Sequence, residues 1–150
     1  MSNRKASTQT RTASTLAAEM RAVFRKLKLR LREHGGHDDL TPSQISVILR
    51  LEKDGPSTVS SLAREEGMRP QSMSAVVIPL QESGLVKGVS DPSDGRQTLM
   101  SLTPKCLKLL REGRAARQDW LATTISQKLS VREQESLWAA LELFTRLVED

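Results

Sequence analysis

Few residues in this chain have the types and spacing that chemistry requires. Its 150 residues include only two histidines and one cysteine. His34 and His37 have a His-x-x-His spacing that could bind zinc, and two aspartates follow them directly. A zinc site needs ligands on a firm scaffold, however, and the two glycines between these histidines make the segment a loop. We therefore expect a helix end and a turn at residues 34–39, and no metal ion.

The single cysteine, Cys106, cannot form a disulfide within the chain, so a reducing, cytoplasmic setting is expected. Cys106 falls in the first turn of a predicted helix, where the helix dipole favours a thiolate. The chain has no second thiol to resolve an oxidised one, so we expect a packed, inert thiol. The two tryptophans, Trp120 and Trp138, are expected in the interior or lining a pocket.

Sequence patterns typical of enzymes are missing from the chain. It contains no Gly-x-Ser-x-Gly, no phosphate-binding glycine loop and no paired acid–base cluster. Its longest uninterrupted apolar run is only a few residues, far short of the roughly 20 that a membrane-spanning helix needs. We therefore expect no enzymatic activity, no cofactor and no membrane partner.

Short polar side chains suited to DNA binding lie at the start of a helix predicted over residues 70–83. Gln71, Ser72 and Ser74 project from its first turns, where such groups can enter a major groove and contact base edges or phosphates. The helix N-terminus carries partial positive charge, which favours a nearby phosphate. Pro79 lies inside this helix and removes one backbone hydrogen bond, so we expect a bend but not a break.

A turn-rich loop at residues 91–96 separates two segments predicted to be strands, 85–89 and 97–102. This hairpin presents Arg96 at its tip, and a narrow groove with enhanced negative potential attracts such an arginine. Asp94 could hold Arg96 by a charge-assisted hydrogen bond. Further candidates for contacts with DNA phosphates are Arg64, Arg69 and Lys87.

The net charge of +5 is compatible with an anionic partner. The excess of basic residues comes entirely from residues 1–40, which contain nine basic and four acidic residues. Residues 41–150 contain fourteen of each. The chain has only two phenylalanines, two tryptophans and no tyrosine. A single-strand binder built on aromatic stacking is therefore not expected.

The elements that would position these residues are marked by periodicity and capping signals. Residues 1–12 are polar and basic without periodicity, which indicates a disordered tail. Helix-capping residues stand before the later helices, and two of them begin capping boxes. These capping residues are Thr41, Thr58, Thr103 and Ser130. The helix after Thr41 runs to about residue 53, and its residues predicted to face inward are Ile45, Ile48, Leu49 and Leu51.

Long amphipathic helices are predicted at both ends, over residues 13–34 and 104–150. Apolar residues at spacings of three and four form one seam on each. The middle segment, residues 41–102, is too small to cover both seams, and exposed apolar stripes are normally covered by a partner. We therefore expect a homodimer with C2 symmetry. Its predicted contacts are Leu16, Met20, Phe24, Leu137, Leu141, Phe144 and Val148.

The order of elements indicates a mainly α fold with a small β-hairpin wing: a winged helix-turn-helix with long N- and C-terminal dimerisation helices. The most specific motif is Asp91-Pro92-Ser93-Asp94-Gly95-Arg96, followed by Leu102-Thr103-Pro104. Less specific motifs are Leu40-Thr41-Pro42-Ser43-Gln44, Leu62-Ala63 and Gly84-Leu85-Val86. Through these residues the chain resembles the MarR family (multiple-antibiotic-resistance-type regulators) of prokaryotic transcription factors. The resemblance covers residues 13–150 as a single domain.

This resemblance implies a transcriptional regulator, usually a repressor, that binds a pseudo-palindromic operator as a homodimer. It places helix 70–83 in the major groove and Arg96 in the minor groove, and it implies a small aromatic or phenolic effector that releases the DNA. Many members carry basic residues at recognition-helix positions that here correspond to Pro70 and Ala75, so the preferred DNA sequence stays open. The alternative is a winged-helix protein-interaction or assembly module whose DNA binding is lost or incidental.

Overall fold

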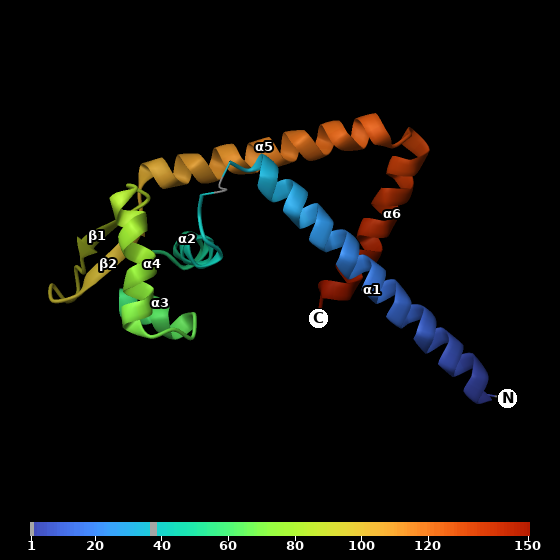
Figure 1. Cartoon of the computed structure of the whole chain (residues 1–150), viewed down its shortest axis with the longest axis horizontal. Coiled ribbons are helices and arrows are strands. Elements are labelled where there is room, and N and C mark those ends of the chain that lie inside the picture. The colour runs from blue at the N-terminus through green and yellow to red at the C-terminus, as the bar shows by residue number, and fades with distance from the viewer. Residues whose placement is uncertain (1, 37–38) are drawn as a thin grey trace. The chain divides into compact units, whose positions relative to one another are not determined.

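The structure, a computed structural model, describes residues 2–36 and 39–150, and within these ranges it describes side chains from Thr12 onward. Contacts divide the chain into two compact units. Gly36–Arg114 is called the central unit below, and the helical unit joins the segment ending at Gly35 to Ala115–Asp150. Over the residues that the structure describes, the chain is mainly helical with one antiparallel β-hairpin, as predicted from the sequence (Figure 1).

The central unit has the predicted order of helices followed by a hairpin. The strands pair antiparallel, from Val86 opposite Leu102 to Ser90 opposite Thr98, and an isolated bridge joins Ser57 to Met100. In Figure 1, α4 lies beside the hairpin and α3 lies against α4. The elements are α2 (Pro42–Asp54), α3 (Val59–Glu65), α4 (Pro70–Glu82), β1 (Val86–Ser90), β2 (Thr98–Leu102) and the first part of α5 (Pro104–Lys128).

The helix starts are those that the capping signals predicted. Thr41 Oγ1 accepts a hydrogen bond from the Gln44 N–H at 3.2 Å, and Gln44 Oε1 accepts one from the Thr41 N–H at 2.9 Å. This reciprocal pair satisfies two backbone donors that the first turn of α2 leaves free. Ser130 and Glu133 form the same arrangement at α6, and Thr58 caps α3.

The core of the central unit differs from the prediction on one helix. Leu49 was predicted to face inward, but it is 45% exposed, whereas Val47 is buried together with Ile48 and Leu51. Each helical residue turns the side-chain direction by about 100°, so a face centred on residues 47, 48 and 51 turns residue 49 away. Other core residues come from every neighbouring element and include Leu62, Met73, Leu80, Val86 and Met100.

The helical unit contains α1 (Ser2–His34), the end of α5 and α6 (Val131–Val148). We expected a disordered tail over residues 1–12, but α1 begins at Ser2. Residues 2–12 contain neither glycine nor proline, and a helix already formed gains one backbone hydrogen bond for each residue added. α1 and α6 contact each other through Phe24 and Phe144, whose ring centres are 5.4 Å apart in an edge-to-face arrangement.

The two tryptophans have different surroundings. Trp120 is partly buried, and its ring stacks on His34 with ring centres 4.6 Å apart. Trp138 was predicted in the interior or lining a pocket, but it is 72% exposed. It lies on α6, a helix with no buried residue. His37 lies outside the described residues, so the expected absence of a metal ion at this loop stays a prediction.

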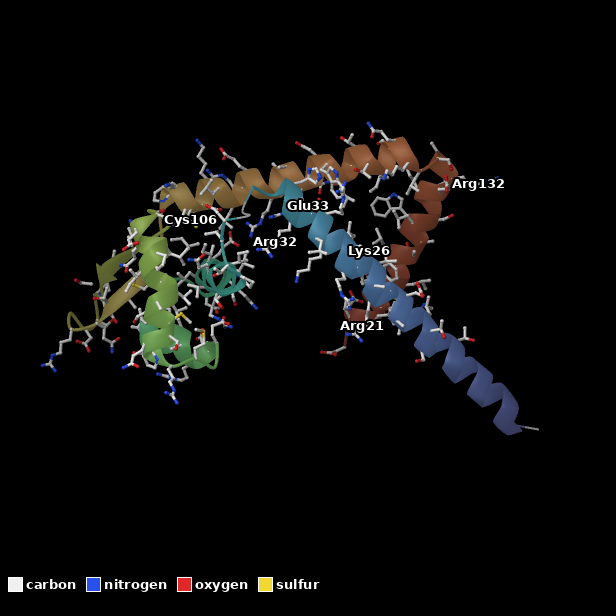
Figure 2. All side chains as sticks on the ribbon, in the orientation of Figure 1. Arg21, Lys26, Arg32, Glu33, Cys106 and Arg132 are labelled. Carbon is white, nitrogen blue, oxygen red and sulfur yellow. The ribbon has the colours of Figure 1, made fainter. Side chains whose placement is uncertain are left out.

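No helix in the described part of the chain is both long enough and apolar enough to cross a membrane. Charged residues instead recur along α1, as the positions of Arg21, Lys26, Arg32 and Glu33 in Figure 2 show. A helix that spans a membrane must be apolar on all sides over about 20 residues.

Candidate nucleic-acid interface

The turn between α3 and α4 is built from backbone hydrogen bonds around Gly67. The Met68 N–H donates to the Ala63 carbonyl at 2.8 Å, and the Gly67 N–H donates to the Arg64 carbonyl at 3.3 Å. This pair of bonds is a Schellman motif, and it requires a residue with positive φ, which Gly67 supplies at 65°. The chain then extends through Arg69, and Pro70 begins α4. The turn thereby fixes the direction in which α4 leaves α3.

A cluster of charged side chains also holds this turn. Glu66, the last residue before Gly67, accepts hydrogen bonds from Arg50 Nε and Ser46 Oγ, each at 2.9 Å. Arg50 Nη1 also lies 3.3 Å from a Glu65 carboxylate oxygen. The hydrogen bond from Arg50, assisted by the one from Ser46, lowers the pKa of the Glu66 carboxyl below its usual value. The cluster ties α2 to the end of α3, and the sequence patterns did not reveal it.

α4 has one buried and one exposed side. Met73, Val77 and Leu80 are buried in the core. Of the predicted DNA-contacting residues, Gln71 and Ser72 are exposed, whereas Ser74 is half-buried at the edge of the helix. Three further predicted contacts are exposed in the same central unit: Arg64 on α3, Arg69 at the cap of α4 and Lys87 on β1.

The sequence prediction missed two exposed apolar residues on α4. Ala75 is exposed, and Ile78 is 49% exposed. They follow Gln71 at positions i+4 and i+7, which share one face of a helix. The sequence signal that could have identified them is the i+4 and i+7 spacing from Gln71, on the side of the helix opposite its buried residues.

The end of α4 is tied to the start of α5. A second Schellman motif occurs here, with the Leu85 N–H donating to the Leu80 carbonyl at 2.9 Å and Gly84 at a φ of 72°. Thr103 Oγ1 donates to the Gly84 carbonyl at 2.6 Å and also accepts from the Cys106 N–H at 3.2 Å. One hydroxyl therefore caps α5 and holds the last turn of α4.

Pro79 does not interrupt α4. The helix continues to Glu82, as predicted, with the Ser83 N–H donating to the Pro79 carbonyl at 3.0 Å. Ser83 Oγ donates to the same carbonyl at 2.8 Å. The loss of the proline N–H is therefore tolerated within a continuous helix.

The tip of the hairpin is folded by its two aspartates. Asp91 Oδ1 accepts from the Ser93 N–H at 2.8 Å, and Asp94 Oδ1 accepts from the Arg96 N–H at 3.1 Å. These are Asx turns, in which a side chain replaces a backbone acceptor. We expected Asp94 to hold the Arg96 side chain, but it holds the Arg96 backbone instead. The guanidinium group of Arg96 is exposed and forms no ion pair with a described carboxylate.

Cys106 is buried in the first turn of α5 (Figure 2). Burial raises the pKa of its thiol, and the nearby charge of Glu52 raises it further. Glu52 itself is ionised by its pairing with Arg114, which lowers the pKa of the Glu52 carboxyl. Cys106 is therefore a packed thiol, as predicted.

The apolar residues of the helical unit are largely uncovered. α6 has no buried residue. Of the predicted dimer contacts, Met20, Leu137 and Phe144 are half-buried, and Phe144 packs on Phe24. The exposed predicted contacts are Leu16, Phe24, Leu141 and Val148, and exposed apolar residues that the prediction did not include are Val23, Leu29, Val131, Trp138, Leu143 and Leu147.

A helix-turn-helix followed by a hairpin, with an exposed recognition helix and an arginine at the wing tip, defines a winged helix-turn-helix regulator of transcription that binds DNA. The MarR family profile matches residues 38–97, which span α2 to the wing tip. The chain belongs to the MarR family.

Similar proteins extend this likeness over nearly the whole chain. An HTH-type transcriptional regulator of Mycobacterium tuberculosis is 33% identical over 135 residues, covering 90% of this chain and 94% of the relative. The HTH-type transcriptional repressor MdtR of Bacillus subtilis is 26% identical and covers 85% of this chain and 80% of its own length. A transcriptional regulator of Pseudomonas aeruginosa with a crystal structure is 32% identical, has a TM-score of 0.76, and covers 91% of this chain and 95% of its own.

Proposed function

We propose that this protein is a ligand-responsive repressor that binds a pseudo-palindromic operator as a homodimer. α4 enters the major groove, and Arg96 enters the adjacent minor groove. The observation that carries this proposal is the exposed guanidinium of Arg96 on a tip folded by two Asx turns, in the same compact unit as the exposed Gln71 and Ser72. An arginine presented in this way suits a narrow, electronegative groove.

The second part of the proposal, the homodimer, rests on α6. Its exposed apolar side chains include Trp138, Leu141, Leu143 and Leu147. Because each residue turns the side-chain direction by about 100°, these side chains spread over more than half of the helix circumference. This apolar surface is wider than the stripe that a helix needs for packing against one neighbour. α1 covers part of this surface through Phe24, and a second copy of the helical unit covers the rest.

Repression and release by an effector complete the proposal. A relative of this chain, MdtR, is named a repressor. A dimer that occupies its operator blocks transcription by excluding polymerase, and a small aromatic or phenolic ligand that changes the spacing of the two recognition helices releases it. The test is DNA release on addition of a panel of aromatic acids. Affinity that no compound of the panel changes contradicts the ligand response.

DNA binding is tested by competition between a duplex from upstream of the protein's own gene and random duplex at matched salt. We expect preference for the upstream duplex, with affinity falling steeply as salt rises, because phosphate contacts release counterions. Equal affinity for both duplexes contradicts operator binding and favours the protein-interaction alternative.

The wing is tested by Arg96→Ala, which should weaken binding to the upstream duplex about 10-fold, corresponding to one lost groove contact. Arg132→Ala is the matched control, because it removes the same charge at the start of α6 in the helical unit (Figure 2). Sedimentation should show that both variants remain dimers. Unchanged affinity of the Arg96 variant contradicts the role of the wing.

A further inference from the structure

The outermost side of α4 is apolar at its centre. Taking the buried Met73 and Leu80 as the inward direction, the opposite side carries Gln71, Ala75 and Ile78, and Glu82 ends the row at the last residue of the helix. This row contains no basic side chain, and Ile78 is 49% exposed. An exposed isoleucine in the middle of a recognition helix has no role in the core.

The major groove offers one apolar group to such a row. Thymine presents its C5-methyl group there, whereas guanine and cytosine present only hydrogen-bonding groups. Alanine and other apolar side chains contact this methyl, and a glutamine such as Gln71 can pair with adenine. Guanine is most often read by arginine or lysine, which this row lacks.

We propose that Ala75 and Ile78 are specificity-determining residues that contact thymine methyl groups in each half-site. The inference rests on the proposed placement of α4 in the major groove. The positive charges near the row favour DNA over a protein partner, because they can contact phosphates. The exposed Arg64 and Arg69 flank the turn that precedes α4, and the exposed Lys87 lies on β1, which packs against α4. The half-sites are therefore read chiefly at A·T pairs.

The experiment begins with a duplex that the wild-type dimer selects from a random-sequence library. Each thymine of that duplex is then replaced singly by deoxyuridine, which removes the methyl group and keeps the base pairing. Burial of one methyl contributes about 0.8 kcal/mol, so each contacted thymine should cost about 4-fold in affinity. Replacement at the symmetric positions of both half-sites should cost about 15-fold.

The variant Ile78→Ala assigns the contact. It should bind the unmodified duplex more weakly and should lose the response to deoxyuridine at the thymine that Ile78 contacts. Leu107→Ala is the matched control, because Leu107 is a 40% exposed apolar residue on α5 in the same unit. It should keep the full response.

The outcomes separate this inference from the proposed function. A selected duplex whose affinity is indifferent to deoxyuridine at every thymine overturns the methyl contacts and leaves operator binding intact. An equal deoxyuridine response in the wild type and in Ile78→Ala overturns the assignment to Ile78. If the library yields no selected sequence at all, that result contradicts both the proposed operator binding and the proposed methyl contacts.

Discussion

Asp94 accepts a hydrogen bond from the backbone N–H of Arg96, and Asp91 accepts one from Ser93. Both carboxylates of the wing motif are therefore used to fold the tip. The sequence identified Asp94 and Arg96 as a pair, because their spacing is local. It assigned the wrong atom of Arg96, since a carboxylate two residues away can reach either the backbone or the side chain.

Asp94→Ala should weaken operator binding about 5-fold, because losing one hydrogen bond of about 1 kcal/mol lets the tip sample other conformations. Asp94→Asn should retain nearly wild-type affinity, since the asparagine oxygen can accept the same bond. Titration of labelled duplex measures both variants. Equal losses in the two variants would instead indicate that the negative charge itself is required.

Glu66 predicts a pH dependence of stability. Its pKa is lowered in the folded protein by Arg50, so its contribution to stability is present above the usual carboxyl value of 4.5 and is lost as the pH falls through the lower, folded-state value. Glu66→Gln should lower the free energy of unfolding by about 1 kcal/mol at pH 7 and should show a smaller loss on acidification. Urea unfolding across pH 7 to 3 measures this, with Glu112→Gln, at an exposed position of α5, as control. Parallel pH profiles of wild type and Glu66→Gln contradict the role of Glu66.

At the scale of elements, the helix boundaries could be predicted because their causes are local. Thr41 with Gln44 and Ser130 with Glu133 form the capping boxes that the sequence shows. Contacts between elements could not be predicted in this way. The pairing of Glu66 with Arg50 joins residues far apart in the sequence, and no local pattern marks it.

Thr103 connects the recognition helix to α5, and its hydroxyl both donates and accepts. Thr103→Val keeps the shape of the side chain but loses both bonds, so it should lower the free energy of unfolding by about 2 kcal/mol. Thr103→Ser keeps the hydroxyl and should lose much less. Denaturant unfolding distinguishes them, and a larger loss in Thr103→Ser than in Thr103→Val would show that the methyl group, not the hydroxyl, matters.

At the scale of the whole molecule, the sequence predicted that apolar residues of the terminal helices need a partner. It placed one narrow seam on each helix, whereas the exposed residues also include Trp138 and Leu147. Periodicity identifies which residues share a face, but it does not show which of two apolar faces the chain itself covers. That choice depends on how α1 and α6 pack, as at Phe24 and Phe144.

Leu141→Glu should dissociate the dimer, because a carboxylate would be buried in an apolar interface without a partner. Loss of the second recognition helix should lower operator affinity by about 100-fold. Ala139→Glu places the same charge on the polar face of α6 and should leave the dimer intact. Sedimentation velocity distinguishes the two, and a dimeric Leu141 variant would exclude this face from the interface.

We propose that two copies of the chain join by their terminal helices and present two α4 helices to successive major grooves. A hydroxyl-radical footprint of the wild-type protein on its selected duplex tests this most directly. We predict two symmetric protected patches on one face of the DNA, about 10 bp apart, with further protection where Arg96 enters the minor groove. A single patch, or two patches on opposite faces of the duplex, would contradict the account.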